Sequence, residues 1–200
     1  MKQRLPILML IAAQGCAGTP APVDVSAAPA ADAGVQPGAN RAEQLARLLA
    51  TADQLSRAAR PDKKALAGTL LSIEELGAAP LADFAGDPVP AWRASVQSEI
   101  DKAPPFRGRV LGAAYRLGWI DGASTLRMEQ LFLGGKSATV AMSVSPASPV
   151  RLQIIDADQK TICTANAGNS CVWMPQYTRR YTIEVKNLSD DKARYYLALN

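Results

Sequence analysis

Residues 181–186 read Tyr-Thr-Ile-Glu-Val-Lys, and stretches of this kind decide the class of fold. Apolar and polar side chains alternate with a period of two, as in a β-strand that has one face in a core and the other in solvent. Residues 126–130, 140–144, 150–154 and 195–199 alternate in the same way, and turn-forming residues separate these stretches. The pattern predicts a small antiparallel β-sandwich over residues 123–200. Because no predicted strand is followed by a crossover helix, a parallel sheet is not expected.

Upstream of residue 123 the apolar residues repeat with the period of a helix. A first helix is predicted to open at Asn40, which has capping-box-like spacing to Glu43, and to end at Pro61. A second is predicted from Asp62 to Leu76, and a third begins at Asp87-Pro88 and runs to Pro104. Their apolar stripes favour helix packing over a ligand groove.

Residues 106–122 contain four glycines, which argue against a sustained helix, and we interpret them as a connector. Residues 40–122 therefore form a helical region with its connector, followed by the sandwich over residues 123–200. The predicted fold class is α+β.

The first 16 residues have the features of an export signal. Lys2 and Arg4 precede an apolar run at residues 5–13, which is too short to span a bilayer. The run ends in Ala13-Gln14-Gly15-Cys16, which resembles the lipobox of bacterial lipoproteins and implies a lipid on Cys16. The residue after the cysteine is not Asp, so resemblance to proteobacterial lipoproteins implies the outer membrane, facing the periplasm or the exterior. The alternative is secretion to the periplasm without an anchor.

Residues 17–39 are predicted to be a disordered linker, because 15 of these 23 residues are Ala, Pro or Gly and no apolar period is visible. A flexible chain of this length reaches about 25–30 Å. That reach suits a tether between a membrane and a folded domain. A leader without such a role would have the same sequence features.

Composition excludes several classes of function. The chain has no histidine, so it lacks the commonest general base and the commonest zinc ligand. From Cys16 onward it carries 20 basic and 18 acidic side chains, which are interleaved, so we expect no nucleic-acid partner. No metal site, cofactor or catalytic residue is predicted, and the protein is expected not to be an enzyme.

Three short motifs fit loops better than active sites. Residues 134–137 (Gly-Gly-Lys-Ser) lack the first glycine of a phosphate-binding loop and precede a strand. Asp156-Ala157-Asp158 begins like a calcium loop, but Lys160 stands where a third ligand belongs. Residues 189–192 have the Ser-x-x-Lys spacing of penicillin-recognising enzymes, whose chemistry needs the serine at the start of a helix. Here the motif lies between two predicted strands.

Several segments from Leu131 onward occur in the order found in a known family. They are Leu131 to Gly135, the strand 152–158 that enters an acidic turn, Cys171 to Pro175, Val185 to Asn187, and the closing residues 196–200. This stretch resembles the bacterial pre-peptidase C-terminal domain and its envelope-protein relatives. The resemblance implies a β-sandwich outside the cytoplasm that serves as an accessory module without an active site. Some members bind calcium through acids, but the corresponding residues 149–152 carry none.

Two sets of residues are candidates for a structural or functional role. Cys163 and Cys171 are symmetric about Ala167, and a hairpin with a three-residue loop ending in Gly168 would bring them together as a disulfide. The densest cluster of aromatic and arginine side chains is predicted as a binding surface, with Tyr196 pointing outward. It comprises Tyr177, Arg179, Arg180, Arg194 and Tyr196.

Two functions remain open at this point. The first is a non-catalytic, membrane-tethered envelope lipoprotein that acts as a binding or structural module for a protein or glycan partner. The second is an accessory or inhibitory subunit of a secreted hydrolase.

Overall fold

The computed structural model describes residues 37–102 and 112–200, with side chains from residue 41 onward. Cys16, the predicted signal and most of the predicted linker therefore lie outside the described residues. The elements are the helices α1 (Pro37–Arg57), α2 (Lys63–Glu75), α3 (Val89–Ser95) and α4 (Gln97–Ile100), and the strands β1 (Ala79–Pro80), β2 (Ala114–Ile120), β3 (Thr125–Phe132), β4 (Ala138–Ser145), β5 (Val150–Ile155), β6 (Thr161–Asn166), β7 (Ser170–Trp173), β8 (Arg179–Asn187) and β9 (Ala193–Leu199).

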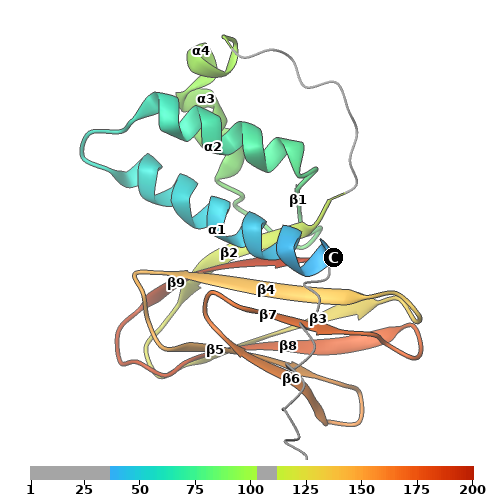
Figure 1. Cartoon of the computed structure of the whole chain (residues 1–200). Coiled ribbons are helices and arrows are strands. Elements are labelled where there is room, and N and C mark those ends of the chain that lie inside the picture. The colour runs from blue at the N-terminus through green and yellow to red at the C-terminus, as the bar shows by residue number, and fades with distance from the viewer. Residues whose placement is uncertain (1–36, 103–111) are drawn as a thin grey trace, which may run out of the picture. The chain divides into compact units, whose positions relative to one another are not determined.

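The strands form two sheets (Figure 1). Sheet A has the strand order β1-β2-β9-β4-β7, and sheet B has the order β3-β8-β5-β6. All strand pairs except β1–β2 are antiparallel. Helices that precede a mostly antiparallel two-sheet sandwich give the α+β class, so this prediction is confirmed.

The helices follow their sequence signals with two differences. The side chain of Asp62 caps α2 by accepting a hydrogen bond from the backbone nitrogen of Ala65 at 2.9 Å, and Gly77 follows its end with φ of +67°. Helix α1 begins at Pro37, three residues before the predicted start, and it ends at Arg57, four residues before Pro61. The predicted third helix is two short helices, because Val96 leaves the helical conformation at φ −127°.

The interpretation of residues 106–122 as a connector is wrong for residues 114–120, which form β2. This strand pairs with β9 along its whole length. Gly118, which argued against regular structure, lies where the ring of Tyr195 crosses the strand. A Cβ atom there would be 2.9 Å from the Tyr195 hydroxyl oxygen, so the glycine permits a close approach within the strand.

The short β1 pairs in parallel with β2, and the chain between them carries α3 and α4. This two-residue pair was not predicted, but it does not make a parallel sheet, which the sequence did not lead us to expect. Two residues, of which one is Pro80, give no alternating pattern by which a strand could be predicted.

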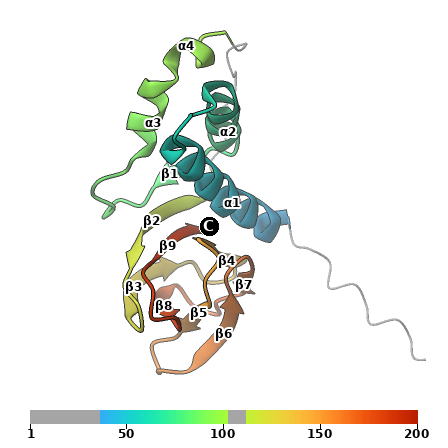
Figure 2. The ribbon, with the colours of Figure 1, turned by 90° about the vertical axis from the view of Figure 1, so that its left-hand side faces the viewer.

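Helix α1 packs on the outer face of sheet A, so β4 and β9 are buried on both faces (Figure 2). The small side chains of Ala141 and Ala198 belong to the same core as Leu45 and Leu49 of α1. A second core lies between the two sheets and includes Leu152, Ile183 and Leu197. The predicted alternation of buried and exposed residues therefore holds for β3 and fails for β4 and β9.

Cys163 and Cys171 form the predicted disulfide, with Cα atoms 5.8 Å apart. The predicted hairpin is wrong, however, because β6 belongs to sheet B and β7 to sheet A. The chain crosses between the sheets at residues 167–169, with Gly168 at φ +91°. The disulfide therefore joins the two layers of the sandwich rather than two neighbours in one sheet.

Candidate binding surface

The predicted binding residues do not form one surface. Tyr177 and Arg180 are exposed, the first in the segment before β8 and the second on that strand. Tyr196 and Arg194 lie on β9 in sheet A, where α1 covers the strand. The structure thus separates the five residues into two regions.

Tyr196 is fully buried, so the prediction that it points outward is wrong. Its hydroxyl group donates a hydrogen bond of 2.7 Å to Oδ2 of Asp53 on α1. Arg194 forms an ion pair of 2.9 Å with the other oxygen of the same carboxylate. Burial and the hydrogen bond to Asp53 raise the pKa of the Tyr196 phenol. These side chains attach the helix to the sheet.

The side chain of Arg179 is already paired with the acidic turn between β5 and β6. Its guanidinium group lies 3.3 Å from carboxylate oxygens of Asp156 and Asp158 and stacks on the ring of Tyr181 at 5.3 Å. The other oxygen of Asp156 accepts hydrogen bonds of 2.9 Å from the backbone nitrogens of Asp158 and Lys160. An arginine therefore neutralises the two carboxylates that resemble the start of a calcium loop.

Two loops are joined at the end of the sandwich where Tyr177 lies. The β3–β4 loop donates from the backbone nitrogen of Gly135 to the carbonyl oxygen of Pro175, at 2.7 Å. It also donates from Gly134 to Oγ1 of Thr178 at 3.0 Å. Gly134 is required here, because a Cβ atom would lie 2.9 Å from the backbone of the β7–β8 loop.

Beneath these loops lies a cluster of three aromatic rings. Phe132 and Trp173 have ring centroids 4.8 Å apart, and each contacts Tyr181 at 5.9 and 5.4 Å respectively. The two pairs that involve Phe132 are edge-to-face, and rings in this geometry at these distances stabilise a structure beyond the area that they bury. The joined loops therefore rest on a rigid base.

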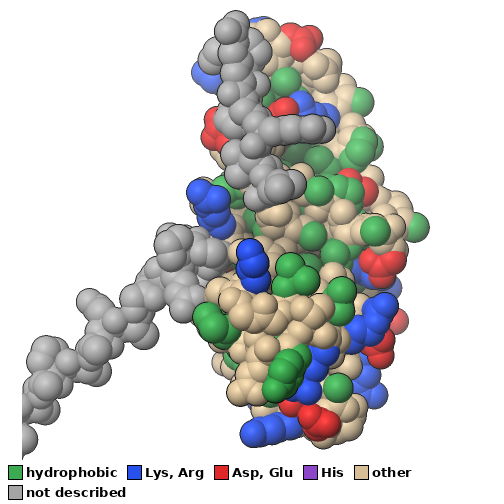
Figure 3. Space-filling view, turned by 90° about the vertical axis from the view of Figure 1, so that its right-hand side faces the viewer, with side chains coloured by type: hydrophobic (Ala, Val, Ile, Leu, Met, Phe, Trp, Pro, Cys, Tyr) green, Lys and Arg blue, Asp and Glu red, His purple; other side chains and the backbone are tan. Residues whose placement is uncertain are grey.

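On this base the chain exposes a group of apolar side chains next to two cations, and we call this group the end surface. It consists of Leu131, Leu133, Lys136, Met174, Tyr177 and Arg180. Tyr177 is the most exposed large apolar or aromatic residue described, at 72%. Figure 3 shows this end of the sandwich, with apolar side chains beside lysine and arginine side chains.

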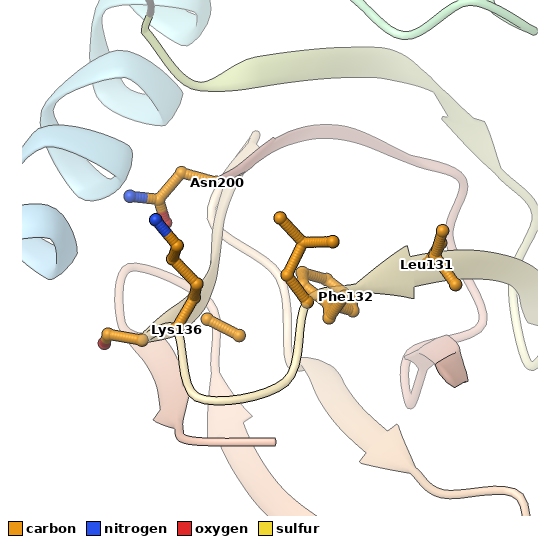
Figure 4. A pocket seen from close by; sticks show the side chains of 7 residues that line it. Leu131, Phe132, Lys136 and Asn200 are labelled. Carbon is orange, nitrogen blue, oxygen red and sulfur yellow. The ribbon is translucent and has the colours of Figure 1, made fainter. Parts of the chain in front are cut away.

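A hollow of about 320 Å³ opens beside the end surface. Figure 4 shows Lys136 reaching toward Asn200 on one side of the hollow, with Phe132 opposite. No acidic side chain lines it. The end surface and its hollow can therefore accommodate an apolar group of a ligand or partner that has acidic groups around it.

Sequence reasoning found Tyr177 and Arg180 and missed Leu131, Leu133 and Met174. Leu131 occupies an outward position of β3, opposite Arg180 of β8, where the alternation requires a polar side chain. An apolar residue at an outward position of a strand was the sequence signal that could have indicated an exposed binding surface here. The hydrogen bonds that join the two loops have no signal in the local sequence, because they connect residues about 40 positions apart.

No protein-family model matches the chain, and no curated protein sequence matches it. Among solved structures it is similar to a periplasmic inhibitor of g-type lysozyme, PliG from Aeromonas hydrophila, with 16% identity over 44% of this chain and 84% of that chain, at a TM-score of 0.38. It is also similar to the Yersinia pseudotuberculosis-derived mitogen, with 14% identity over 44% of this chain and 85% of that chain, at a TM-score of 0.40. Similarity at this level supports no inference about activity or partner.

Neither of two other site types is found in the described part of the chain. Residues 37–102 and 112–200 contain no group of three or more Cys, Asp or Glu side chains placed to hold a metal ion. None of the described helices has the length and apolar character needed to cross a bilayer.

Proposed function

We propose that this protein is a non-catalytic binding module of the bacterial cell envelope and that the end surface binds a protein partner. The observation that carries the proposal is the exposure of four large apolar or aromatic side chains at one end of the sandwich. Leu131 lies on β3, and Leu133, Met174 and Tyr177 lie on the two joined loops. Monomeric proteins seldom expose such groups together unless the surface is used. The chain's lack of histidine supports a function other than catalysis.

The charge of the end surface favours a partner with an acidic rim. Lys136 and Arg180 are both exposed and neither forms an ion pair with the described residues. Complementary charge at a rim raises the association rate more than the affinity. The partner is therefore expected to carry Asp or Glu side chains around an apolar centre.

The test is a paired capture experiment from envelope fractions. The triple variant Leu133→Ser, Met174→Ser, Tyr177→Ser is expected to weaken partner binding at least about 100-fold, because apolar anchors dominate interface energetics. The matched control is Ile162→Ser with Leu188→Ser, which are also exposed apolar residues but lie outside the end surface. Thermal melts establish that all variants are folded.

Two outcomes would contradict the proposal. One is a folded triple variant that binds the wild-type partner with unchanged affinity. The other is a captured ligand that survives protease and is destroyed by a glycosidase, since that ligand would be a glycan. A second measurement is the association rate of the charge-reversed variant Lys136→Glu, Arg180→Glu, which is expected to bind the partner about tenfold more slowly at low salt.

The second candidate function is an accessory or inhibitory subunit of a secreted hydrolase, for which the same surface would bind the enzyme. If the captured partner is a hydrolase, its activity is assayed with the wild-type chain and with the triple variant. A change in rate produced by the wild-type chain alone favours this function. Equal rates in both assays favour a binding role without inhibition.

We further propose that a lipid on Cys16 holds the mature protein at the outer membrane. The apolar run at residues 5–13 and the Gly15-Cys16 pair support this. The variant Cys16→Ser is expected to move the protein from the membrane fraction to the soluble fraction. Mass spectrometry of the wild-type protein provides the control: a mature N-terminus beyond Cys16 without an acyl mass would show that the anchor is wrong.

A further inference from the structure

A second site, unrelated to the end surface, lies where α1 ends on the outer face of sheet A. The helix stops at Arg57, and beyond it the sheet is left partly uncovered. Trp119 of β2 lies there, opposite Arg194 of β9, and this residue is 46% exposed. The two preceding residues on the same face of β2, Tyr115 and Leu117, are buried. The exposed indole therefore belongs to a gap in the helical cover.

Three cations surround this indole. The guanidinium groups of Arg57 and Arg194 each lie 5.3 Å from the ring centroid, and the ammonium group of Lys192 lies 5.8 Å from it. Lys192 also forms an ion pair of 3.0 Å with Asp121. Cations at such distances are attracted to the ring quadrupole, which holds them beside it.

Asp53 orients the two guanidinium groups and leaves part of each unbound. It accepts from Nε of Arg57 at 3.1 Å and pairs with Nη2 of Arg194 at 2.9 Å. The terminal nitrogens of Arg57 have no partner among the described residues, and its side chain is half exposed. Nε of Arg194 is buried and also lacks a described partner. The site thus has more hydrogen-bond donors than acceptors, which suits an anion.

A pocket of about 320 Å³ joins these donors to neutral polar groups. It is lined in part by Gln54, Arg57, Trp119, Ser145, Pro146 and Arg194. Nε2 of Gln54 donates to Oγ of Ser145 at 2.9 Å, so the amide oxygen and the hydroxyl hydrogen remain for a ligand. The volume is at the lower end of the range for small-molecule sites.

We propose that this pocket binds a sugar that carries a carboxylate, such as a hexuronic acid residue of an acidic glycan. The carboxylate would accept from the free nitrogens of Arg57, in the paired geometry that guanidinium groups favour. The ring hydroxyls would bond to Gln54 and Ser145, and the apolar edge of the pyranose would lie against Trp119 and Pro146. The ligand is held by non-covalent contacts alone.

The indole N–H signals of the full chain test this directly, because the chain has three tryptophans. Methyl glucuronide is expected to shift the Trp119 signal alone, with a Kd on the order of 1 mM. The signals of Trp92, which is buried, and Trp173 serve as internal references. Methyl glucoside, which lacks the carboxylate, and acetate, which lacks the ring, are each expected to bind at least about tenfold more weakly.

Variants separate recognition from folding. Arg57→Gln is expected to weaken glucuronide binding at least about tenfold, whereas Arg47→Gln should leave it unchanged. The two arginines are matched, since both lie on α1, both pair with the acid four residues earlier, and their side chains are 50% and 58% exposed. Trp119→Leu, followed by the signals of nearby backbone amides, is expected to remove binding.

Three results would overturn the proposal. Equal affinity for the glucoside would mean that the carboxylate is not recognised. Equal affinity for acetate would mean an adventitious anion site only. No shift of the Trp119 signal at about 20 mM glucuronide would mean that the pocket does not take this class of ligand. None of these results bears on the end surface, which lies on other strands and loops.

Discussion

Asp53 should be the most sensitive single position at the contact between the helices and the sandwich. Its carboxylate is buried and accepts from Tyr196 at 2.7 Å, from Arg194 at 2.9 Å and from Arg57 at 3.1 Å. The side chain of Arg194 is only 11% exposed, so Asp53→Ala leaves a nearly buried guanidinium without a counter-ion. Breaking a buried pair in this way costs about 3–5 kcal/mol.

The other contributions to this cost are smaller. Arg57 is half exposed, so its pair with Asp53 adds about 0–1 kcal/mol. The lost hydrogen bond to Tyr196 is worth about 1 kcal/mol and is counted within the 3–5 kcal/mol rather than added to it. At about 2–4 °C per kcal/mol for a domain of this size, Asp53→Ala should lower the Tm by about 10–15 °C.

A compensating variant makes the argument specific to charge. Asp53→Leu, Arg194→Met and Tyr196→Phe together replace the polar groups with apolar ones and should cost less than Asp53→Ala alone. Urea unfolding followed by circular dichroism measures both, and Asp83→Ala is the control. Asp83 also pairs with an arginine, Arg116, but its side chain is 72% exposed, so its loss should cost less than about 1 kcal/mol. A loss below about 1 kcal/mol for Asp53→Ala would refute the reasoning, as would a triple variant less stable than the single one.

Three further predictions concern stability. Replacing Cys163 and Cys171 with alanine should cost about 2.5 kcal/mol, the value for closing so short a loop, and added reductant should then leave the unfolding midpoint of this variant unchanged. Burial raises the pKa of the Tyr196 phenol above its value in the unfolded chain. The contribution of the neutral phenol to stability is therefore complete below about pH 10 and is lost at higher pH, where the unfolded chain ionises first. In urea titrations, the difference in unfolding free energy between wild type and Tyr196→Phe should narrow by about 1.4 kcal/mol from pH 8 to pH 11. Gly118→Ala should cost about 1–3 kcal/mol because its Cβ would meet a buried ring, whereas Gly68→Ala in α2, with nothing within 4 Å, should stabilise by about 0.8–1 kcal/mol; thermal melts of the pair that show equal shifts would contradict this.

The sandwich could be predicted wherever a strand has one face in the core and one in solvent. The alternation at residues 126–130 and 150–154 follows from that environment, and it matches β3 and β5. In β8 the alternation at residues 181–185 is interrupted by Glu184, which is buried and pairs with Arg127. The same rule failed at β9, where Tyr-Tyr-Leu-Ala-Leu at residues 195–199 was interpreted as alternating. A continuous apolar run is the pattern of a strand buried on both faces, and this signal places Tyr196 beneath a helix.

Other features depend on contacts between distant residues and have no local pattern. The glycine in β2 looks like a strand breaker until the ring that crosses it is known. The partition of β6 and β7 between two sheets could not be predicted either, because a three-residue loop fits a hairpin as well as a crossing between layers. The disulfide was predicted correctly because both geometries bring Cys163 and Cys171 within reach.

The arrangement of the layers explains why the end of the sandwich is the better place for a protein partner. Helix α1 covers most of the outer face of sheet A and leaves exposed the gap around Trp119, where charged side chains surround the ring. The outer face of sheet B carries paired polar groups, among them Arg127 and Glu184 at 2.7 Å and Gln153 with Thr164 at 3.3 Å. A partner that covered this face would have to remove water from groups that already bond to each other, with little gain. The end surface offers apolar side chains whose burial is favourable, and its two cations lie at the rim, where they can remain partly hydrated while they pair.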